Sequence, residues 1–451
     1  MNWRKPVLLG LMQANGMNVK GNLEFIHKLE KQTPEEIQKF QQEQLKKILQ
    51  HAAEKVPYYS KILTKSEVYA DGKINLKNFQ KIPPLNKEII RTQKTNLHST
   101  DKDARQWYKN SSGGSTGEPV ELIQDRNYKA WSFAGKMYFN LLAGKDVGER
   151  EVRIWGSERD IISGSQTKRA RFENWLYNRT ILNSFKMTPQ KMVNYAEIIN
   201  SEKPLLIESY VQPMYQFAIF LQENNLQIRS PKGIITSAGT LTPSMKQEIK
   251  KTFKCSVHNK YGSREVGDMA CSCEKDEGLH LNPATHVIEI LDDKMQPVKS
   301  GEIGSVYVTT LQNYSMPLIR YKIGDLAVSA RKTICSCGRN LPLIQHVEGR
   351  EMSVFKKKDG TIIPAEFFIH FIGVVHNKGF IEKFQVIQED YEAITIKAVI
   401  KNKKEFEKNK DAIEKSIRKT MGEKCEIKWE QVNEIPPLKS GKYLYTISKI
   451  K

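Results

Sequence analysis

The chain has 451 residues, 39% of them hydrophobic and 27% charged, which is enough for two or more domains with buried cores. Its 71 Lys and Arg residues exceed its 51 Asp and Glu residues and give a net charge of +20. The lysines are scattered, which is typical of solvated helix faces, so we expect no nucleic-acid partner. No apolar run approaches the roughly 18 residues that cross a bilayer, and this predicts a cytoplasmic protein. Peripheral contact with an anionic membrane stays open, given the basic charge.

Hydrophobic patterning predicts a large domain followed by a small one. Residues 34–62 carry apolar side chains at helical spacing and predict an amphipathic helix, and from residue 152 to 310 short β-branched runs alternate with helical stretches. After Arg350, the runs FQVIQED, AITIKAVI and EIKWEQV and a charged helix over residues 406–421 predict a β-α-β unit. We therefore predict an α/β fold, with a large multi-layer α/β domain over residues 1–350 and a small α+β domain over residues 351–451.

One loop of small and hydroxyl residues has the composition of a phosphate-binding loop. It reads Ser111-Ser112-Gly113-Gly114-Ser115-Thr116-Gly117-Glu118-Pro119. Backbone amides and hydroxyls can surround a polyphosphate here, because glycine lets the backbone approach the anion closely. No lysine follows Gly117, so the loop is not a Walker A motif. A flexible surface loop without a ligand is the alternative.

Further motifs follow this loop in a fixed order. They are Ser237-Ala238-Gly239-Thr240, Tyr261-Gly262-Ser263-Arg264-Glu265, Arg320-Tyr321-Lys322-Ile323-Gly324-Asp325, Gly349-Arg350 and Ser440-Gly441-Lys442. Together with the loop, they resemble the motif series of the adenylate-forming superfamily of acyl-CoA synthetases and adenylation domains. The segments KVPYY, YGSRE and MPLIRY and the paired C-x-C segments look like the phenylacetate-CoA ligase branch, with its CapK-like and coenzyme F390 synthetase-like members.

The resemblance implies a role for each motif. Residues Ser112, Gly113, Gly114, Ser115, Thr116 and Gly117 would hold the ATP phosphates, and Ser237, Ala238 and Gly239 would line the adenine pocket. Tyr261 would stack beside the adenine, with Gly262, Ser263 and Arg264 in the same nucleotide-binding motif. Glu265 would ligate Mg²⁺, and Asp325 would accept hydrogen bonds from the ribose hydroxyls. Arg350 would sit at the hinge, and Lys442, on a small and mobile C-terminal domain, would stabilise charge during adenylation. Arg264 departs from the threonine that is more common before the glutamate.

The cysteines favour a metal site over a disulfide framework, because four of the six fall in two C-x-C pairs. Cys273, His280, Cys335 and Cys337 offer three thiolates and an imidazole, which suit a tetrahedral structural Zn²⁺ with no open position. In the phenylacetate-CoA ligase branch the C-x6-H and C-x-C-G-R segments match this set. Cys271 is the reserve ligand if Cys273 points away, and unligated thiols are the alternative.

The resemblance implies an ATP-dependent ligase that forms an acyl adenylate from a small carboxylic acid and passes the acyl group to CoA or to an amine or sugar acceptor. Surface-polysaccharide assembly is the setting that the CapK-like members suggest. Two alternatives share the motifs: an adenylyltransferase that leaves AMP on its acceptor, and a non-catalytic assembly component. The segment Trp155-Gly156-Ser157-Glu158-Arg159 is a candidate wall of the acyl pocket. The oligomeric state is not set by the motifs, with a dimer as one option.

Overall fold

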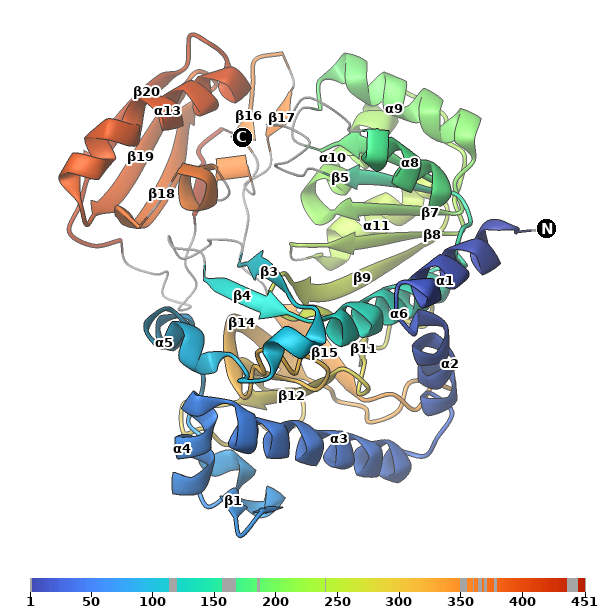
Figure 1. The fold of residues 1–451 in the computed structure, drawn as a ribbon. Helices are drawn as coiled ribbons and strands as arrows, with labels where there is room; N and C mark the ends of the chain where they lie inside the picture. Colours follow the sequence, from blue (N-terminus) through green and yellow to red (C-terminus); the bar gives the residue numbers. More distant parts are fainter. Residues whose placement is uncertain are drawn as a thin grey trace. The chain divides into compact units, whose positions relative to one another are not determined.

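The chain forms two compact units, and each is described by itself (Figure 1). The computed structural model describes residues 2–112, 120–155, 168–184, 187–239, 241–348, 355–359, 361–363, 367–368, 371–376, 379–435 and 445–450. The first unit holds the described parts of 1–112, 120–148 and 258–349, and the second holds those of 149–257 and 350–451. No helix among these residues is both long and apolar enough to cross a bilayer.

The N-terminal part of the first unit is helical. Its helices are α1 (Arg4–Ala14), α2 (Val19–Leu29), α3 (Pro34–Lys55), α4 (Pro57–Lys65), η1 (Leu76–Lys81), α5 (Lys87–Gln93), η2 (Lys94–Leu97), η3 (Lys102–Arg105) and α6 (Arg126–Leu142). Short hairpins are β1 (Tyr69–Ala70) with β2 (Lys73–Ile74), and β3 (Tyr108–Ser111) with β4 (Glu121–Gln124).

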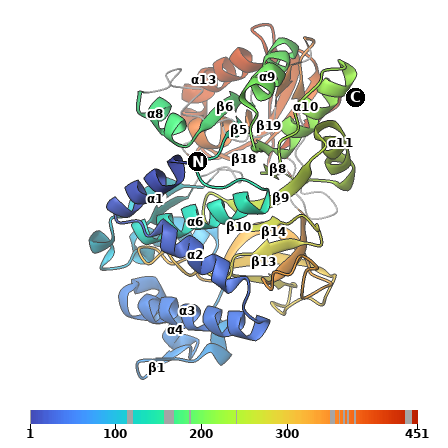
Figure 2. The same cartoon turned by 90° about the vertical axis from the view of Figure 1, so that its right-hand side faces the viewer.

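The amphipathic helix that the spacing predicts over residues 34–62 is in fact two helices, α3 and α4, which lie side by side (Figure 2). The predicted apolar stripe of α3 is buried, and a capping box at Thr33 begins the helix. The break falls at Pro57, which has no N–H to continue the α3 ladder but is well placed as the first residue of α4.

The rest of the first unit is an antiparallel sheet. In the order β12-β13-β14-β15-β11-β10-β9 its strands are His286–Leu291, Ile303–Thr310, Tyr321–Ser329, Leu343–Glu348, Leu279–Leu281, Gly267–Ser272 and Ser256–Ser263. The predicted alternation of strands and helices over residues 152–310 therefore stops at residue 253, and from β9 onward strand follows strand. Neighbouring strands in this order pair antiparallel, and no helix lies between them in the chain to form a parallel crossover.

The second unit contains a parallel sheet in the order β8-β7-β5-β6, as the α/β pattern predicts. Its elements are β5 (Glu151–Trp155), α8 (Lys168–Leu176), β6 (Arg179–Asn183), α9 (Pro189–Glu202), β7 (Leu206–Tyr210), α10 (Val211–Glu223), β8 (Gly233–Ser237) and α11 (Pro243–Phe253). One face of the sheet, with Ile154, Ile207 and Ile234, packs in a fully buried core with Phe217 and Phe253 of the helices.

The C-terminal part of the second unit is a four-stranded sheet with one long helix (Figure 1). Its elements are β16 (Phe355–Lys356), β17 (Ile362–Ile363), the π-helix η4 (Phe371–His376), β18 (Ile381–Asp390), β19 (Ala393–Ile400), α13 (Lys403–Met421), β20 (Glu426–Gln431) and β21 (Thr446–Ser448). β19 and β20 pair in parallel across α13, which confirms the predicted β-α-β element. Ile413 and Ile417 of α13 are fully buried in its core.

Candidate functional site

The YGSRE motif forms the hairpin between β9 and β10. Ser263 pairs with Gly267, so the residues Arg264, Glu265 and Val266 make a three-residue turn. Gly267 has φ +80°, the left-handed conformation that such turns use. Gly262 is required for a different reason: a Cβ atom there would lie 2.6 Å from the carbonyl oxygen of Gly267. The two glycines let the strands close tightly and present Glu265 at the tip.

The structure brings Tyr261 and Asp325 together, although they come from different motifs. Tyr261 Oη donates a hydrogen bond of 2.9 Å to Asp325 Oδ2. Tyr261 lies on β9 with 8% of its surface exposed, and Asp325 follows Gly324, which has φ +90°, on β14. A carboxylate has two oxygens with about four lone-pair sites, so it can accept several hydrogen bonds at once. An aromatic ring and a carboxylate therefore stand side by side in the first unit.

Glu265 has a cationic neighbour that the motifs did not indicate. Lys87 Nζ lies 3.5 Å from Glu265 Oε1, and the two side chains are 14% and 7% exposed. Lys87 is the first residue of α5, after the N-cap Asn86. A cation at a helix N-terminus faces the unfavourable end of the helix dipole. That misplaced charge is the sequence signal that could have pointed to a carboxylate partner.

The arginine of the MPLIRY segment is structural. Arg320 is 1% exposed, and its guanidinium contacts Glu289 at 3.0 Å and donates to the carbonyls of Gln80 and Ile82 at 2.6 and 2.7 Å. Leu85 then pairs through its backbone with Arg320 and Lys322. These bonds tie the segment before α5 to β14, and so position Lys87.

The start of the phosphate-loop motif is well packed. Ser112 is fully buried, and its hydroxyl accepts a hydrogen bond of 2.9 Å from Val120 N, while Ser112 N donates to Val120 O. Ser112 and Val120 therefore bring both ends of the loop together. Gly113, Gly114, Ser115, Thr116 and Gly117 lie outside the described residues, as do Arg350 and Lys442.

The donor chemistry of the YGSRE turn fits a nucleotide with its divalent cation. Glu265 supplies a carboxylate, a hard ligand suited to Mg²⁺. Ser263 Oγ is buried and has no hydrogen-bond partner among the described residues, and Arg264 is exposed beside it. An orphaned hydroxyl next to a cation suits a phosphate oxygen.

In the second unit, the predicted adenine-pocket residues end a strand. Ser237 is the last residue of β8, and Ala238 follows with φ +58°, which is uncommon for a residue with a side chain. The ring of Trp155, at the end of β5, lies 4.1 Å from the ring of Tyr210, at the end of β7. All of these residues stand at the carboxyl edge of a parallel sheet, where α/β folds bind ligands. The sequence motifs did not predict Tyr210, because the only feature that marks it in the sequence is its position at the end of an apolar run.

The four metal-ligand candidates form one cluster, as their residue types predict. The ligand atoms of Cys273, His280, Cys335 and Cys337 all lie within 4.8 Å of one another. The Sγ atoms of Cys273 and Cys335 are 3.6 Å apart, and Cys337 Sγ is 3.4 Å from His280 Nε2. A tetrahedral Zn²⁺ with bonds of about 2.0–2.3 Å separates its ligand atoms by roughly this much.

The protonation chemistry of the cluster also fits a cation. Burial lowers the pKa of His280 to about 4, so the ring is neutral and able to bind a metal. Burial raises the pKa of the Cys335 thiol to about 12, and a bound cation would reverse this by favouring the thiolate. Cys273, and not Cys271, is the residue of the first pair that joins the cluster.

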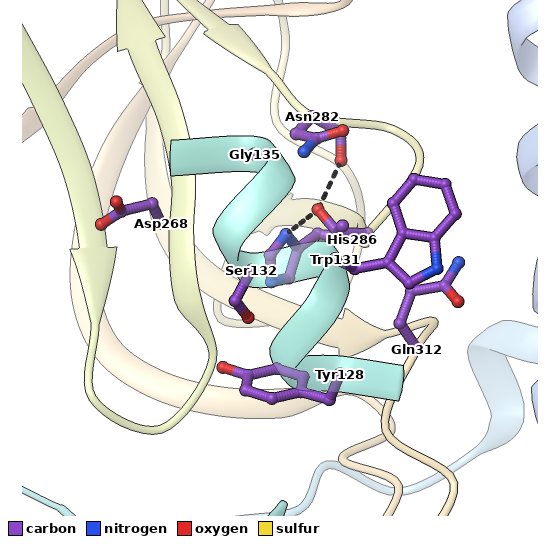
Figure 3. A pocket seen from close by; sticks show the side chains of 9 residues that line it. Tyr128, Trp131, Ser132, Gly135, Asp268, Asn282, His286 and Gln312 are labelled. Carbon is purple, nitrogen blue, oxygen red and sulfur yellow. Dashed lines mark hydrogen bonds between the residues drawn. The ribbon is translucent and has the colours of Figure 1, made fainter. Parts of the chain in front are cut away.

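A small polar cavity in the first unit lies beneath α6 (Figure 3). Among the residues that line it are Tyr128, Asp268, Asn282 and His286. It has room for about one water molecule and so cannot hold a nucleotide or an acyl group. Its importance is structural, because His286 reaches from this cavity to the turn that carries Glu265.

The chain is similar in sequence to two curated proteins. It is 25% identical over 399 residues to Protein CapK of Staphylococcus aureus, which covers 87% of this chain and 85% of that protein. It is 22% identical over 350 residues to the phenylacetate-coenzyme A ligase of Thermus thermophilus, covering 74% of each chain. Residues 355–449 match the family model of the CapK C-terminal domain.

Two solved structures of one enzyme have the same fold. The crystal structure of 2-hydroxyisobutyryl-CoA ligase with 2-HIB-AMP and CoA, in the thioesterification state, matches with a TM-score of 0.62 at 15% identity and covers 93% of this chain and 92% of that chain. The same ligase in the postadenylation state, with 2-HIB-AMP, gives a TM-score of 0.58 at 16% identity and covers 94% and 91%. The chain is therefore homologous to CapK and to phenylacetate-coenzyme A ligase, and it shares its fold with 2-hydroxyisobutyryl-CoA ligase.

Proposed function

We propose that the chain uses ATP to activate a small carboxylic acid as an acyl adenylate, and then transfers the acyl group to the thiol of CoA or to an amine. The observation that supports this most is the pairing of Tyr261 with Asp325 beside the Glu265 turn. A ring, a ribose-binding carboxylate and a metal-binding carboxylate are the set that an adenylate site needs.

In the first half-reaction, a carboxylate oxygen of the substrate attacks the α-phosphorus of ATP and pyrophosphate leaves. Tyr261 packs beside the adenine, and Asp325, which Tyr261 holds by its hydrogen bond, accepts hydrogen bonds from the ribose hydroxyls. Glu265 would hold Mg²⁺, which offsets the negative charge of the phosphates. Lys442 stabilises the charge that develops during the displacement.

In the second half-reaction, the acceptor attacks the acyl carbon and AMP leaves. A thiol acceptor is supported by the homologue that is named a coenzyme A ligase. The CapK homologue supports an amine or sugar acceptor in surface-polysaccharide assembly instead. Trp155 and Tyr210 are the aromatic residues that we assign to the acyl side, because both end strands at the carboxyl edge of the parallel sheet.

The cluster of three cysteines and one histidine would hold a structural Zn²⁺ in this proposal. Four protein ligands complete a tetrahedral shell and leave no position for a substrate. Free thiols and a zinc site also support a reducing compartment, the cytoplasm.

The test is a pyrophosphate-release assay over a panel of aryl, fatty, amino and sugar acids, with and without CoA. We expect release that depends on one class of acid and that Lys442→Ala lowers by about 100-fold or more. Glu265→Gln serves as a second variant, since it removes the proposed metal ligand with little change in shape.

Following labelled AMP separates the competing functions. Release of free AMP after acyl transfer supports a ligase, whereas AMP that stays on the acceptor would identify an adenylyltransferase. Pyrophosphate release that is unchanged in Lys442→Ala would contradict the assignment.

A further inference from the structure

Two of the three residues in the turn that carries Glu265 are buried, which is unusual for a hairpin tip. Glu265 is 7% exposed and Val266 is fully buried. Loops normally lie on the surface, where water satisfies their backbone groups. A buried carbonyl must instead find a donor within the protein, because an unpaired polar group in the interior destabilises the fold. The turn spans three residues, so it has three carbonyls to satisfy.

Three side chains from outside the hairpin supply these donors. Asn110 Nδ2 donates to the carbonyl of Arg264 at 2.9 Å, Gln124 Nε2 to that of Glu265 at 3.2 Å, and His286 Nε2 to that of Val266 at 2.7 Å. Asn110 lies on β3, Gln124 ends β4 and His286 begins β12. Every carbonyl of the turn is thus held by a different strand.

Two of the donors are linked to each other. Asn110 Nδ2 also donates to Gln124 Oε1 at 3.0 Å, which leaves the Gln124 amide nitrogen to face the turn. Asn110 Oδ1 accepts from the backbone of Ser111. Both amides are therefore oriented by their other contacts before they meet the turn.

His286 has one protonation state that fits its surroundings. Its Nε2 faces a carbonyl and must carry the proton, and its Nδ1 lies 2.8 Å from the hydroxyl oxygen of Thr285, which also lies 3.2 Å from the carbonyl oxygen of Asn282 (Figure 3). The ring is 4% exposed, and burial lowers the pKa of His286 to about 4, so the neutral form is present at neutral pH. The histidine is a fixed donor rather than a proton carrier.

We propose that Asn110, Gln124 and His286 are positioning residues, which hold the Glu265 turn in the conformation that directs its carboxylate to the nucleotide-bound Mg²⁺. This inference rests on the proposed role of Glu265. Groups that orient a metal-binding carboxylate affect metal affinity by about 10–100-fold, although they do not touch the ion. The three donors act here on the backbone that carries the carboxylate.

The test compares ATP binding to the full-length protein, by calorimetry, with and without millimolar Mg²⁺. The readout is the factor by which Mg²⁺ strengthens ATP binding. We expect Glu265→Gln to abolish this factor and His286→Leu to reduce it by about 10-fold. His286→Gln should restore most of it, because its amide nitrogen can reach the same carbonyl.

The matched control is His258→Leu. His258 is also fully buried, and its Nδ1 lies 2.8 Å from the carbonyl of Ser272, at the other end of the same hairpin. This variant loses a similar imidazole–carbonyl contact and should keep the Mg²⁺ factor of the wild type. Thermal unfolding of both variants shows whether their losses of stability are comparable.

The outcomes separate the inference from the function on which it rests. If Mg²⁺ strengthens ATP binding in His286→Leu as much as in the wild type, but not in Glu265→Gln, the positioning role is overturned and the role of Glu265 stands. A full factor in Glu265→Gln would overturn both. If His286→Leu does not fold, Gln124→Met removes a second donor to the same turn, and retention of the full factor there would also overturn the inference.

Discussion

Lys87 and Glu265 form a largely buried ion pair beside the predicted nucleotide site. Taking two charges out of water is costly, so each depends on the other for its stability in the interior. The pair gives Glu265 a counter-charge within the protein itself. A metal ion bound by Glu265 would also lie near the positive charge of Lys87, so Lys87 would affect the electrostatic potential at the site.

Replacing Lys87 should destabilise the fold more than replacing an ordinary surface lysine. We expect Lys87→Met to lower the free energy of unfolding by about 3 kcal/mol, because it leaves the Glu265 carboxylate buried without its counter-charge. The measurement is the free energy of unfolding in urea.

The control for this prediction is Lys81→Met. Lys81 also pairs with a glutamate, Glu67, at 2.7 Å, but the two side chains are 55% and 70% exposed. Exposed pairs contribute about 1 kcal/mol or less. Equal losses in the two variants would argue that Glu265 does not depend on Lys87.

The metal cluster joins the ends of several elements. Cys273 follows β10, His280 lies on β11, and Cys335 and Cys337 lie in the connection between β14 and β15. That connection has no helix or strand of its own over residues 330–342. A bound ion would therefore hold in place a segment that regular hydrogen bonding does not.

Zinc content should follow the cluster and not the other cysteines. We expect about one Zn²⁺ per chain by elemental analysis, its loss in Cys335→Ser, and a lower melting temperature in that variant. Cys271→Ser and Cys425→Ser should keep the metal, since neither residue joins the cluster. Zinc retained in Cys273→Ser but lost in Cys271→Ser would show that Cys271, and not Cys273, is the ligand.

At the scale of the whole molecule, each of the two units carries some of the predicted nucleotide-binding residues. Tyr261, Glu265 and Asp325 belong to the first unit, and Ser237 to the second. Lys442 belongs to the predicted small domain over residues 351–451, whose division from the large domain stays a prediction. A ligase that runs two half-reactions can use a lysine on one domain for the first only.

The two half-reactions should respond differently to Lys442→Ala. We expect acyl-AMP formation to fall by about 100-fold or more, because the charge-stabilising group is lost. Transfer from an added, preformed acyl-AMP to the acceptor should stay within about 10-fold of the wild-type rate. Each step is measured separately by single-turnover kinetics. An equal loss in both steps would show that Lys442 serves more than adenylation.

The sequence by itself determined the local elements and the chemistry of the motifs. The charged helix over residues 406–421 and the β-α-β element follow from side-chain spacing, and both are present, with the helix beginning at Lys403. The grouping of three cysteines and a histidine follows from ligand type, because this set suits a tetrahedral metal ion, and the structure brings the four ligand atoms together. The helix and the β-α-β element depend on residues that are close in the sequence. The ligand types depend on the side chains themselves, wherever they stand in the chain.

The tertiary structure alone decided which distant residues meet. Gln124 and Asn110 lie 141 and 154 residues from the carbonyls that they hold, and nothing in their local sequence marks them. The same holds for Lys87 beside Glu265, and for Arg320, a motif residue that turns inward to Glu289 and two carbonyls. A buried charge or carbonyl needs a partner, but only the packing of strands and helices determines which residue provides it.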